Sequence, residues 1–157
     1  MKATKGKVFE VSVSRQQCEY CAKVGPTGFE GDRSGTAGIV LSDVEVVREI
    51  NARFAAQLPE SIQAGMLGDN ILTEGLGNPT DLEPGTLFRI GNTILLRLEA
   101  KAAHYREMFS DDLPEEVLVL LMEKGGVECS VVAGIGHRVV DNDEIEILPA
   151  EELKGAA

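Results

Sequence analysis

The sequence predicts a mainly β fold, a β-barrel with two or three helical insertions. The 157 residues have the length of one domain. Many short segments alternate or cluster apolar residues between turn residues, as strands do, whereas few segments have helical spacing. Many short strands with few helices are typical of a closed barrel. We assign residues 1–150 to a single domain and residues 151–157 to an acidic C-terminal tail.

The predicted strands are apolar runs or segments with a period of two. The first of them places Phe9, Val11 and Val13 on one face. The set comprises residues 7–14, 38–41, 70–73, 86–90, 93–99, 127–132 and 144–148. Gly91-Asn92 is predicted to join two of these strands as a hairpin turn, and residues 141–143 form the turn before the last strand.

Residues 43–58 form the clearest predicted helix, because apolar residues recur at helical spacing until Pro59. Ser42 and Glu45 have the spacing of a capping box at its start, in which the serine caps an amide three residues on and the glutamate reaches back.

Two shorter segments are also candidate helices. Residues 100–108 suit a short helix, and residues 117–124 follow Pro114 and two acids and end at a glycine pair. The β-branched and leucine content of the second segment would also fit a buried strand.

The segment 15–38 is predicted to be a long loop. It has no apparent apolar periodicity, and it contains five glycines and one proline. Loops of this length inside a compact domain usually carry function.

The charge of the chain argues against several classes of partner. The 15 basic and 26 acidic residues give a net charge of −11, and the pI is about 4.6. Such a field repels phosphate backbones and anionic lipid, so nucleic acid and membrane surfaces are not expected partners. No apolar run has the length of a membrane span and no signal peptide is apparent, so we expect a cytoplasmic protein. An anionic small molecule would need a pocket in which the few cations converge.

Several common catalytic motifs are absent. The chain has no Walker loop, no dinucleotide-binding glycine motif, no HExxH and no GxSxG, so neither a nucleotide nor a resident metal is predicted. Cys18 and Cys21 have the CxxC spacing. Three interpretations stay open: incidental thiols in a loop, a redox or sulfur-handling pair, and half of a metal site whose other ligands are not at ligand spacing.

Three clusters are candidates for ligand binding. Residues 28–33 combine glycines with Asp32 and Arg33, and residues 65–75 contain a second Gly-Asp corner. In the third, Lys101 and His104 face the same side of a short helix, where a cation and an imidazole could meet an anion. The alternative for each cluster is a solvated turn or surface pair.

The order of these segments resembles the MOSC domain family, named for the C-terminal domain of molybdenum cofactor sulfurases. The most specific match is Gly-Asp-Asn-Ile-Leu-Thr-Glu-Gly-Leu at residues 68–76, where the family usually has Gly-Glu-Asn or Ala-Glu-Asn. The other matching segments are residues 6–14, 28–32, 40–42, 82–91, 125–127 and 143–145. The resemblance covers about residues 6–148 and is strongest to the short stand-alone members.

The resemblance implies a small barrel of the pyruvate-kinase-barrel type, with a pocket for the anionic pterin of the molybdenum cofactor, molybdopterin. It also implies a role as a sulfur carrier or sulfurtransferase, with molybdenum enzymes or cofactor biosynthesis proteins as partners. Pyridoxal phosphate belongs to a separate domain of the full sulfurases and is not expected here. The short members tend to read Lys-x-Cys-His where this chain has Ala103 before His104. An alanine methyl cannot carry sulfur or bind a metal.

Three hypotheses follow from the residues and the resemblance together. In the first, the chain binds an anionic pterin; the expected ligand-binding residues are Arg15, Lys23, Asp32, Arg33, Asn70, Thr73, Lys101 and His104. In the second, Cys18 or Cys21 replaces the missing family thiol in sulfur transfer, next to a cation that favours the thiolate. In the third, a degenerate barrel acts as a non-catalytic protein-interaction module whose acidic surface faces a basic partner.

Overall fold

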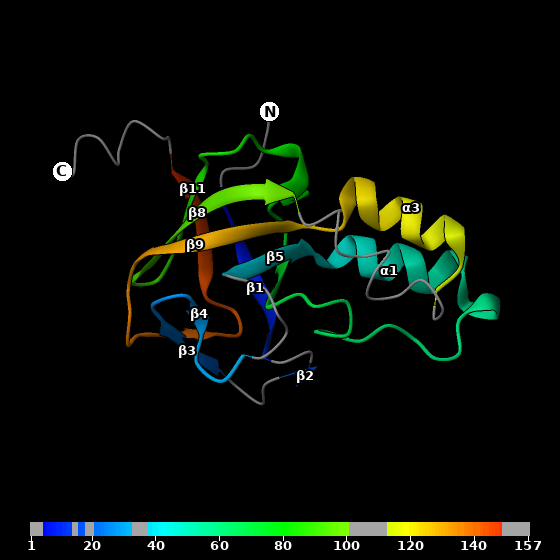
Figure 1. Cartoon of the computed structure of the whole chain (residues 1–157), viewed down its shortest axis with the longest axis horizontal. Coiled ribbons are helices and arrows are strands. Elements are labelled where there is room, and N and C mark those ends of the chain that lie inside the picture. The colour runs from blue at the N-terminus through cyan, green and yellow to red at the C-terminus, as the bar shows by residue number, and fades with distance from the viewer. Residues whose placement is uncertain (1–4, 14–15, 18–20, 33–37, 101–112, 149–157) are drawn as a thin grey trace.

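The structure is a computed structural model, and it describes residues 5–13, 16–17, 21–32, 38–100 and 113–148. Seven strands close into a barrel in the order β1-β11-β7-β8-β9-β5-β6 and back to β1 (Figure 1). The barrel strands are β1 (Lys5–Val13), β5 (Ile39–Asp43), β6 (Ile71–Glu74), β7 (Leu87–Ile90), β8 (Thr93–Ala100), β9 (Val127–Ala133) and β11 (Glu144–Leu148). The mainly β barrel that the sequence predicts is therefore confirmed.

Six of the seven neighbouring pairs in the barrel are antiparallel, and β5 and β6 are the parallel pair. A parallel pair needs a crossover between its strands. Here the crossover is helix α1 (Val44–Arg53) followed by the 3-10 turn η1 (Ala55–Gln57), so the helix begins where β5 ends. This arrangement places the start of α1 at one end of the barrel.

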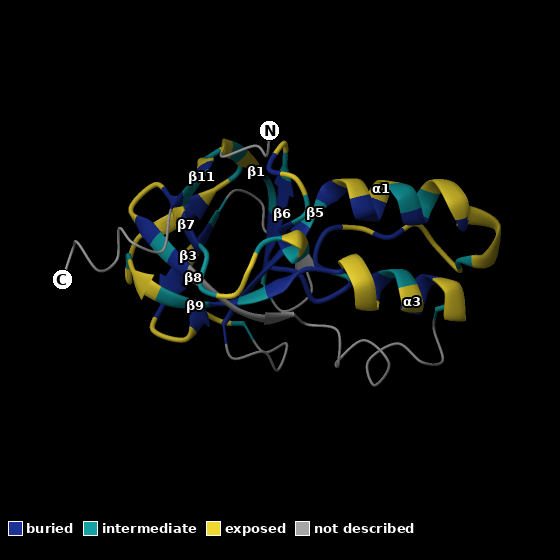
Figure 2. Ribbon diagram, turned by 90° about the horizontal axis from the view of Figure 1, so that it is seen from above, coloured by how far each residue is buried: buried dark blue, intermediate teal, exposed yellow. Residues whose placement is uncertain are grey.

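Two apolar cores follow from this arrangement. One fills the barrel with inward residues of the strands, such as Val11, Ile39 and Phe88, each fully buried. The other joins α1 to helix α3 (Glu115–Lys124) through Val47, Ile50 and other residues of both helices. Figure 2 shows these two helices on the same side of the barrel, each with buried and exposed stretches. No helix in the described ranges has the length and apolarity needed to cross a membrane.

The predicted start of the first helix is wrong in detail. The N-cap is Asp43, whose carboxylate accepts a hydrogen bond from the Glu45 amide at 3.0 Å, instead of Ser42. Ser42 Oγ donates to the Gly125 carbonyl at 2.8 Å, so a partner far along the chain competes successfully for the hydroxyl. Asp and Ser are equally good caps, and local spacing does not distinguish them.

The prediction of a strand-free loop at residues 15–38 is also wrong. It contains β2 (Gln16–Gln17), β3 (Cys21–Gly25) and β4 (Gly28–Phe29), and β3 pairs with β10 (Arg138–Val140), which had no strand prediction. β2 pairs with β1 at the edge of the barrel sheet, whereas β10, β3 and β4 form a separate sheet in that order. In this small sheet the partner of β3 comes from near the other end of the chain. The segment 117–124, for which both a helix and a buried strand were possible, is a helix. The predicted helix at 100–108 falls largely outside the described residues.

Candidate functional site

A hydrogen-bonded junction ties the end of α3 to one end of the barrel. Ser42 Oγ donates to the Gly125 carbonyl, and the Asn78 side chain donates to the Lys124 carbonyl at 3.1 Å. The Gly126 amide donates to Thr80 Oγ1 at 3.1 Å, from the 3-10 turn η2 (Pro79–Asp81). The first two bonds satisfy carbonyls at the end of α3 that have no partner within the helix. All three together hold β5, η2 and α3 in place.

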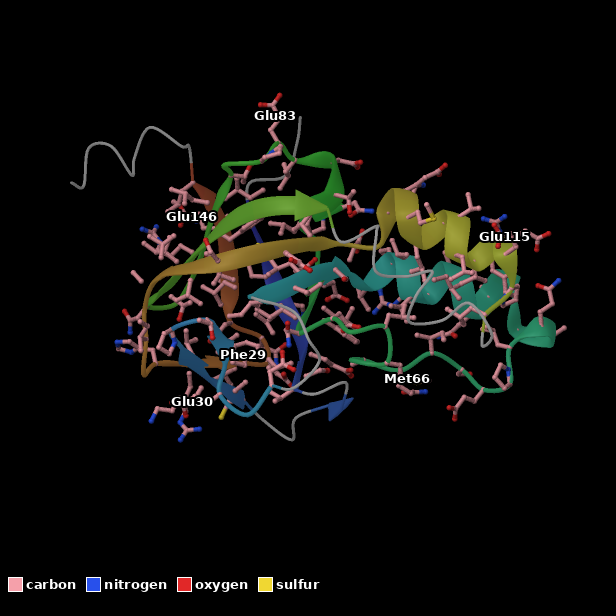
Figure 3. The ribbon with its side chains drawn as sticks, viewed as in Figure 1. Phe29, Glu30, Met66, Glu83, Glu115 and Glu146 are labelled. Atoms are coloured by element: carbon pink, nitrogen blue, oxygen red, sulfur yellow. The ribbon has the colours of Figure 1, made fainter. Side chains whose placement is uncertain are left out.

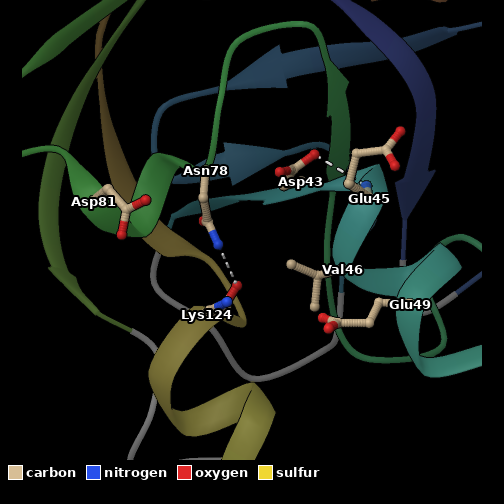
Figure 4. Close-up of a pocket in the computed structure, with 7 residues that line it drawn as sticks. All are labelled: Asp43, Glu45, Val46, Glu49, Asn78, Asp81 and Lys124. Carbon is tan, nitrogen blue, oxygen red and sulfur yellow. Dashed lines mark hydrogen bonds between the residues drawn. The ribbon is translucent and has the colours of Figure 1, made fainter. Parts of the chain in front are cut away.

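A groove of about 420 Å³ opens at this junction. We call it the acidic groove; it is lined by Asp43, Glu45, Val46, Glu49, Asn78, Asp81 and Lys124 (Figure 4). Its volume lies within the range of small-molecule sites. The lining includes four acidic residues and one lysine, so it is suited to hydrogen-bond donors and does not by itself fit a phosphate.

Asp43 is the groove carboxylate whose pKa is clearly shifted in the folded protein. Burial raises the pKa of Asp43, and the nearby carboxylates of Glu45 and Asp81 raise it further, whereas the hydrogen bond from the Glu45 amide and the charge of Arg48 lower it. Arg48 makes ion pairs with Glu45 and Glu74, which keeps its charge at the α1 end of the groove. The charged form of Asp43 is therefore disfavoured, first by its burial and then by two neighbouring carboxylates.

Two substitutions at Asp43 separate its cap from its charge. Asp43→Ala should cost about 1 kcal/mol of unfolding free energy because the Glu45 amide loses its acceptor. Asp43→Asn keeps an acceptor and removes the repelled charge, so we expect it to be at least as stable as the native chain at neutral pH.

The effect of the Asp43 charge on stability should depend on pH. Folding raises the pKa of Asp43, so the folded state binds the proton more tightly, and the associated stability is lost as pH rises through the raised pKa. The stability advantage of Asp43→Asn over the native chain should therefore be larger near about pH 7 than near about pH 4. Urea unfolding at both pH values measures this, and an advantage that shrinks toward neutral pH would contradict the assignment.

The structure brings two of the predicted ligand-binding residues together. Asn70 is 2% exposed, and its Nδ2 donates to Asp32 Oδ2 at 2.9 Å and to the Ser12 carbonyl at 3.2 Å, while its Oδ1 accepts from the Val40 amide at 2.8 Å. The Gly-Asp corner at residues 28–32 is thereby linked to the second corner. Thr73 Oγ1 donates to the Ser42 carbonyl at 3.3 Å. In this structure both Asn70 and Thr73 connect protein segments.

Cys21 and Lys23 lie elsewhere, on β3 of the small sheet. Arg138 Nη1 donates to Cys21 Sγ at 3.4 Å, and neither residue lines the acidic groove. The remaining predicted site residues, Arg15, Cys18, Arg33, Lys101 and His104, lie outside the described residues, as does Ala103. In the part of the chain that is described, no three His, Cys, Asp or Glu side chains are placed to hold a metal ion.

The groove itself was not predicted from the sequence. Asp43, Asp81 and Lys124 come from three separate elements, and no motif connects them. The one available signal was the glycine pair after α3, because a helix that ends at such a pair can pack tightly against a neighbouring strand.

Known structures support the fold. The chain is similar to YuaD of Bacillus subtilis, with 16% identity and a TM-score of 0.65 over 91% of this chain and 95% of YuaD. It is similar to YiiM of Escherichia coli, with 19% identity and a TM-score of 0.68 over 94% of this chain and 71% of YiiM. It is also similar to YiiM of Geobacillus stearothermophilus, with 13% identity and a TM-score of 0.65 over 92% of this chain and 75% of that YiiM.

The similarity to YuaD and YiiM fits the MOSC-like barrel that the sequence resemblance implies. No protein-family model matches the sequence, and no curated protein matches it. At these identities the comparison establishes the fold and leaves the chemistry of the site to the residues of this chain.

Proposed function

We propose that this chain is a MOSC-like protein that binds an anionic pterin of the molybdopterin type in the acidic groove and serves in the handling of that cofactor. The observation that carries the proposal is the groove itself: about 420 Å³, with carboxylates along its lining and Lys124 beside them. The lining of the groove therefore offers hydrogen-bond acceptors for the pterin ring and one cation, Lys124, for the phosphate end of the ligand.

The carboxylates suit the ring of a pterin. Its aminopyrimidinone edge presents adjacent N–H donors, and a carboxylate accepts two parallel hydrogen bonds of this kind well. Asp43 and Asp81 belong to different elements, and their charges lie close enough for Asp81 to raise the pKa of Asp43. A ligand that donates hydrogen bonds to either carboxylate would relieve this repulsion.

The phosphate of the ligand needs more positive charge than Lys124 supplies. Ala100, the last described residue of β8, pairs with Val127, which directly follows the glycine pair of the junction. The chain therefore enters the segment that contains Lys101 and His104 next to the end of the acidic groove. We propose that these two residues complete the phosphate site with Lys124.

Sulfur transfer is not part of this proposal, because Ala103 occupies the position where the short family members tend to have cysteine. Replacement of that thiol by Cys18 or Cys21 stays a prediction, as does association with molybdenum enzymes or cofactor biosynthesis proteins.

Calorimetric titration with molybdopterin tests the binding proposal. Lys124→Ala, Lys101→Ala and His104→Ala should each weaken binding about tenfold, the effect of roughly 1.4 kcal/mol. Asp81→Asn should weaken it by a similar factor, because the amide offers one acceptor in place of two. The control is Lys5→Ala, which removes an exposed lysine paired with Glu144 on the barrel.

Two outcomes would contradict the proposal: no measurable binding by the folded native chain, or equal affinity in the groove variants and the control. Either result would favour the alternative that the barrel is a non-catalytic protein-interaction module.

A further inference from the structure

The small sheet β10-β3-β4 carries two cations without ion-pair partners, whereas most other cations of the described surface are paired with an acid. Most cations with described side chains form an ion pair with a glutamate; these are Lys5, Lys7, Arg48, Arg53 and Arg89. Within the described part of the chain, Lys23, Arg138 and Lys124 form no ion pair with an acid. Lys124 lies in the acidic groove, whereas the other two lie together.

Lys23 and Arg138 are direct cross-strand partners of β3 and β10. Directly opposite residues on neighbouring strands share a face of the sheet, with Cβ atoms about 5 Å apart. Both are exposed, and the buried residues Ala22 and Val139 alternate with them on the opposite face. Glu30, which follows β4 and is labelled in Figure 3, lies opposite Lys23, and its amide donates to the Lys23 carbonyl at 2.9 Å. It makes no ion pair with either cation, so this face carries two cations and one carboxylate and has a positive balance on a chain of net charge −11.

Exposed apolar side chains lie close in the chain to Arg138, and two of them, Ile135 and Val140, are held beside β3. Among described residues the exposed large apolar side chains number five, and three of them, Val132, Ile135 and Val140, lie within one stretch of nine residues. Val140 pairs with Cys21 on the outward face, two residues from Arg138. The turn that carries Ile135 is bonded to β3, because the Gly136 amide donates to the Val24 carbonyl and the Val24 amide donates to the His137 carbonyl, each at 2.8 Å.

We infer that this face, with Lys23, Arg138, Ile135 and Val140, is a docking surface for an acidic segment of a partner protein that also carries apolar residues. Charge complementarity selects the acidic partner, since two cations that form no ion pair gain more from carboxylates than from any other common side chain. The apolar side chains would then be covered by the apolar residues of the segment. The inference does not depend on the proposed function, because none of these residues lines the acidic groove.

The test is a titration of the ¹⁵N-labelled full chain, followed by NMR, with a short peptide that alternates glutamate and valine. We expect amide shifts on β3, β10 and the turn between β9 and β10. Lys23→Glu should weaken binding at least about fivefold, equivalent to roughly 1 kcal/mol. Lys5→Glu is the matched control: it reverses another exposed lysine, on the barrel strand β1 and outside this face, and should change the affinity much less.

Two further peptides examine the chemistry. A peptide that alternates glutamate with serine should bind more weakly than the valine peptide, and a peptide that alternates lysine with valine should not bind. The inference is overturned if the glutamate-valine peptide does not bind, if its shifts fall elsewhere, or if Lys23→Glu leaves its affinity unchanged. It is also overturned if inorganic phosphate binds this face as well as the peptide does, or if the face is covered by self-association of the chain.

Discussion

Replacing Asn70 by aspartate should destabilise the fold by about 3 kcal/mol or more at neutral pH. The substitution keeps the size of the side chain and its acceptor for the Val40 amide. It removes both N–H groups that reach Asp32 and the Ser12 carbonyl, and it places a buried carboxylate against acceptors. An unpaired buried charge is among the most destabilising single changes, so urea unfolding should show a large fall in the midpoint.

The pH dependence separates charge from packing in this prediction. Burial and the Asp32 carboxylate should raise the pKa of the introduced carboxyl in the folded state, so stability returns as pH falls and the group takes up a proton. Asn70→Ala introduces no charge and should cost about 2 kcal/mol or more without this recovery. Asn78→Asp is a control at a less buried asparagine that caps η2, with an expected cost of about 1 kcal/mol. Equal loss in Asn70→Asp and Asn78→Asp would contradict the role of Asn70.

Replacing Gly126 by alanine should cost about 3 kcal/mol or more, because space and backbone conformation both oppose it. The residue has a φ of +121°, and a Cβ there would lie 2.4 Å from Ser42 Oγ and 2.5 Å from the Leu41 carbonyl oxygen. Ser42 would have to give up its bond to Gly125, and Leu41 belongs to a barrel strand that is paired on both sides. Unfolding free energies from urea titration measure the loss.

Gly77→Ala is the matched control. Gly77 also has a positive φ, of +79°, but a Cβ there would have no heavy atom within 4 Å, so only the backbone cost of about 1 kcal/mol is expected. Adding Ser42→Ala to Gly126→Ala should restore only part of the stability, because the Leu41 carbonyl still blocks the methyl group. If Gly126→Ala is as stable as Gly77→Ala, the junction can move aside and does not hold the groove rigidly.

The predictions that held depend on local patterns. Alternation identified the barrel strands from residue 7 onward, and helical spacing identified α1, because the period of the apolar residues is a property of neighbouring positions. The predictions that failed depend on distant partners. β3 has only two inward apolar residues, Ala22 and Val24, too few to reveal a strand whose partner, β10, lies more than a hundred residues away.

For the candidate sites too, local sequence patterns and distant partners have to be distinguished. The motif at residues 68–76 stands out in the sequence, and it led to Asn70 and Thr73 as ligand-binding residues. In the structure their side chains donate to Asp32, to Ser12 and to Ser42, which connects strands that form the end of the barrel. Polar residues in a short motif have the same composition whether their hydrogen bonds go to a ligand or to the backbone, and only the folded partners distinguish the two cases.

The sequence alone determined that the chain is acidic, mainly β and built from short strands around few helices, since charge and periodicity need no knowledge of long-range contacts. Only the tertiary structure placed Asp43, Asp81 and Lys124 around one groove, and Lys23 opposite Arg138 on one sheet face. The physical reason is that hydrogen bonds join segments that are distant in the chain: β3 pairs with β10, and β5 and η2 are bonded to the end of α3. These long-range bonds, and not the spacing of any motif, bring the side chains together.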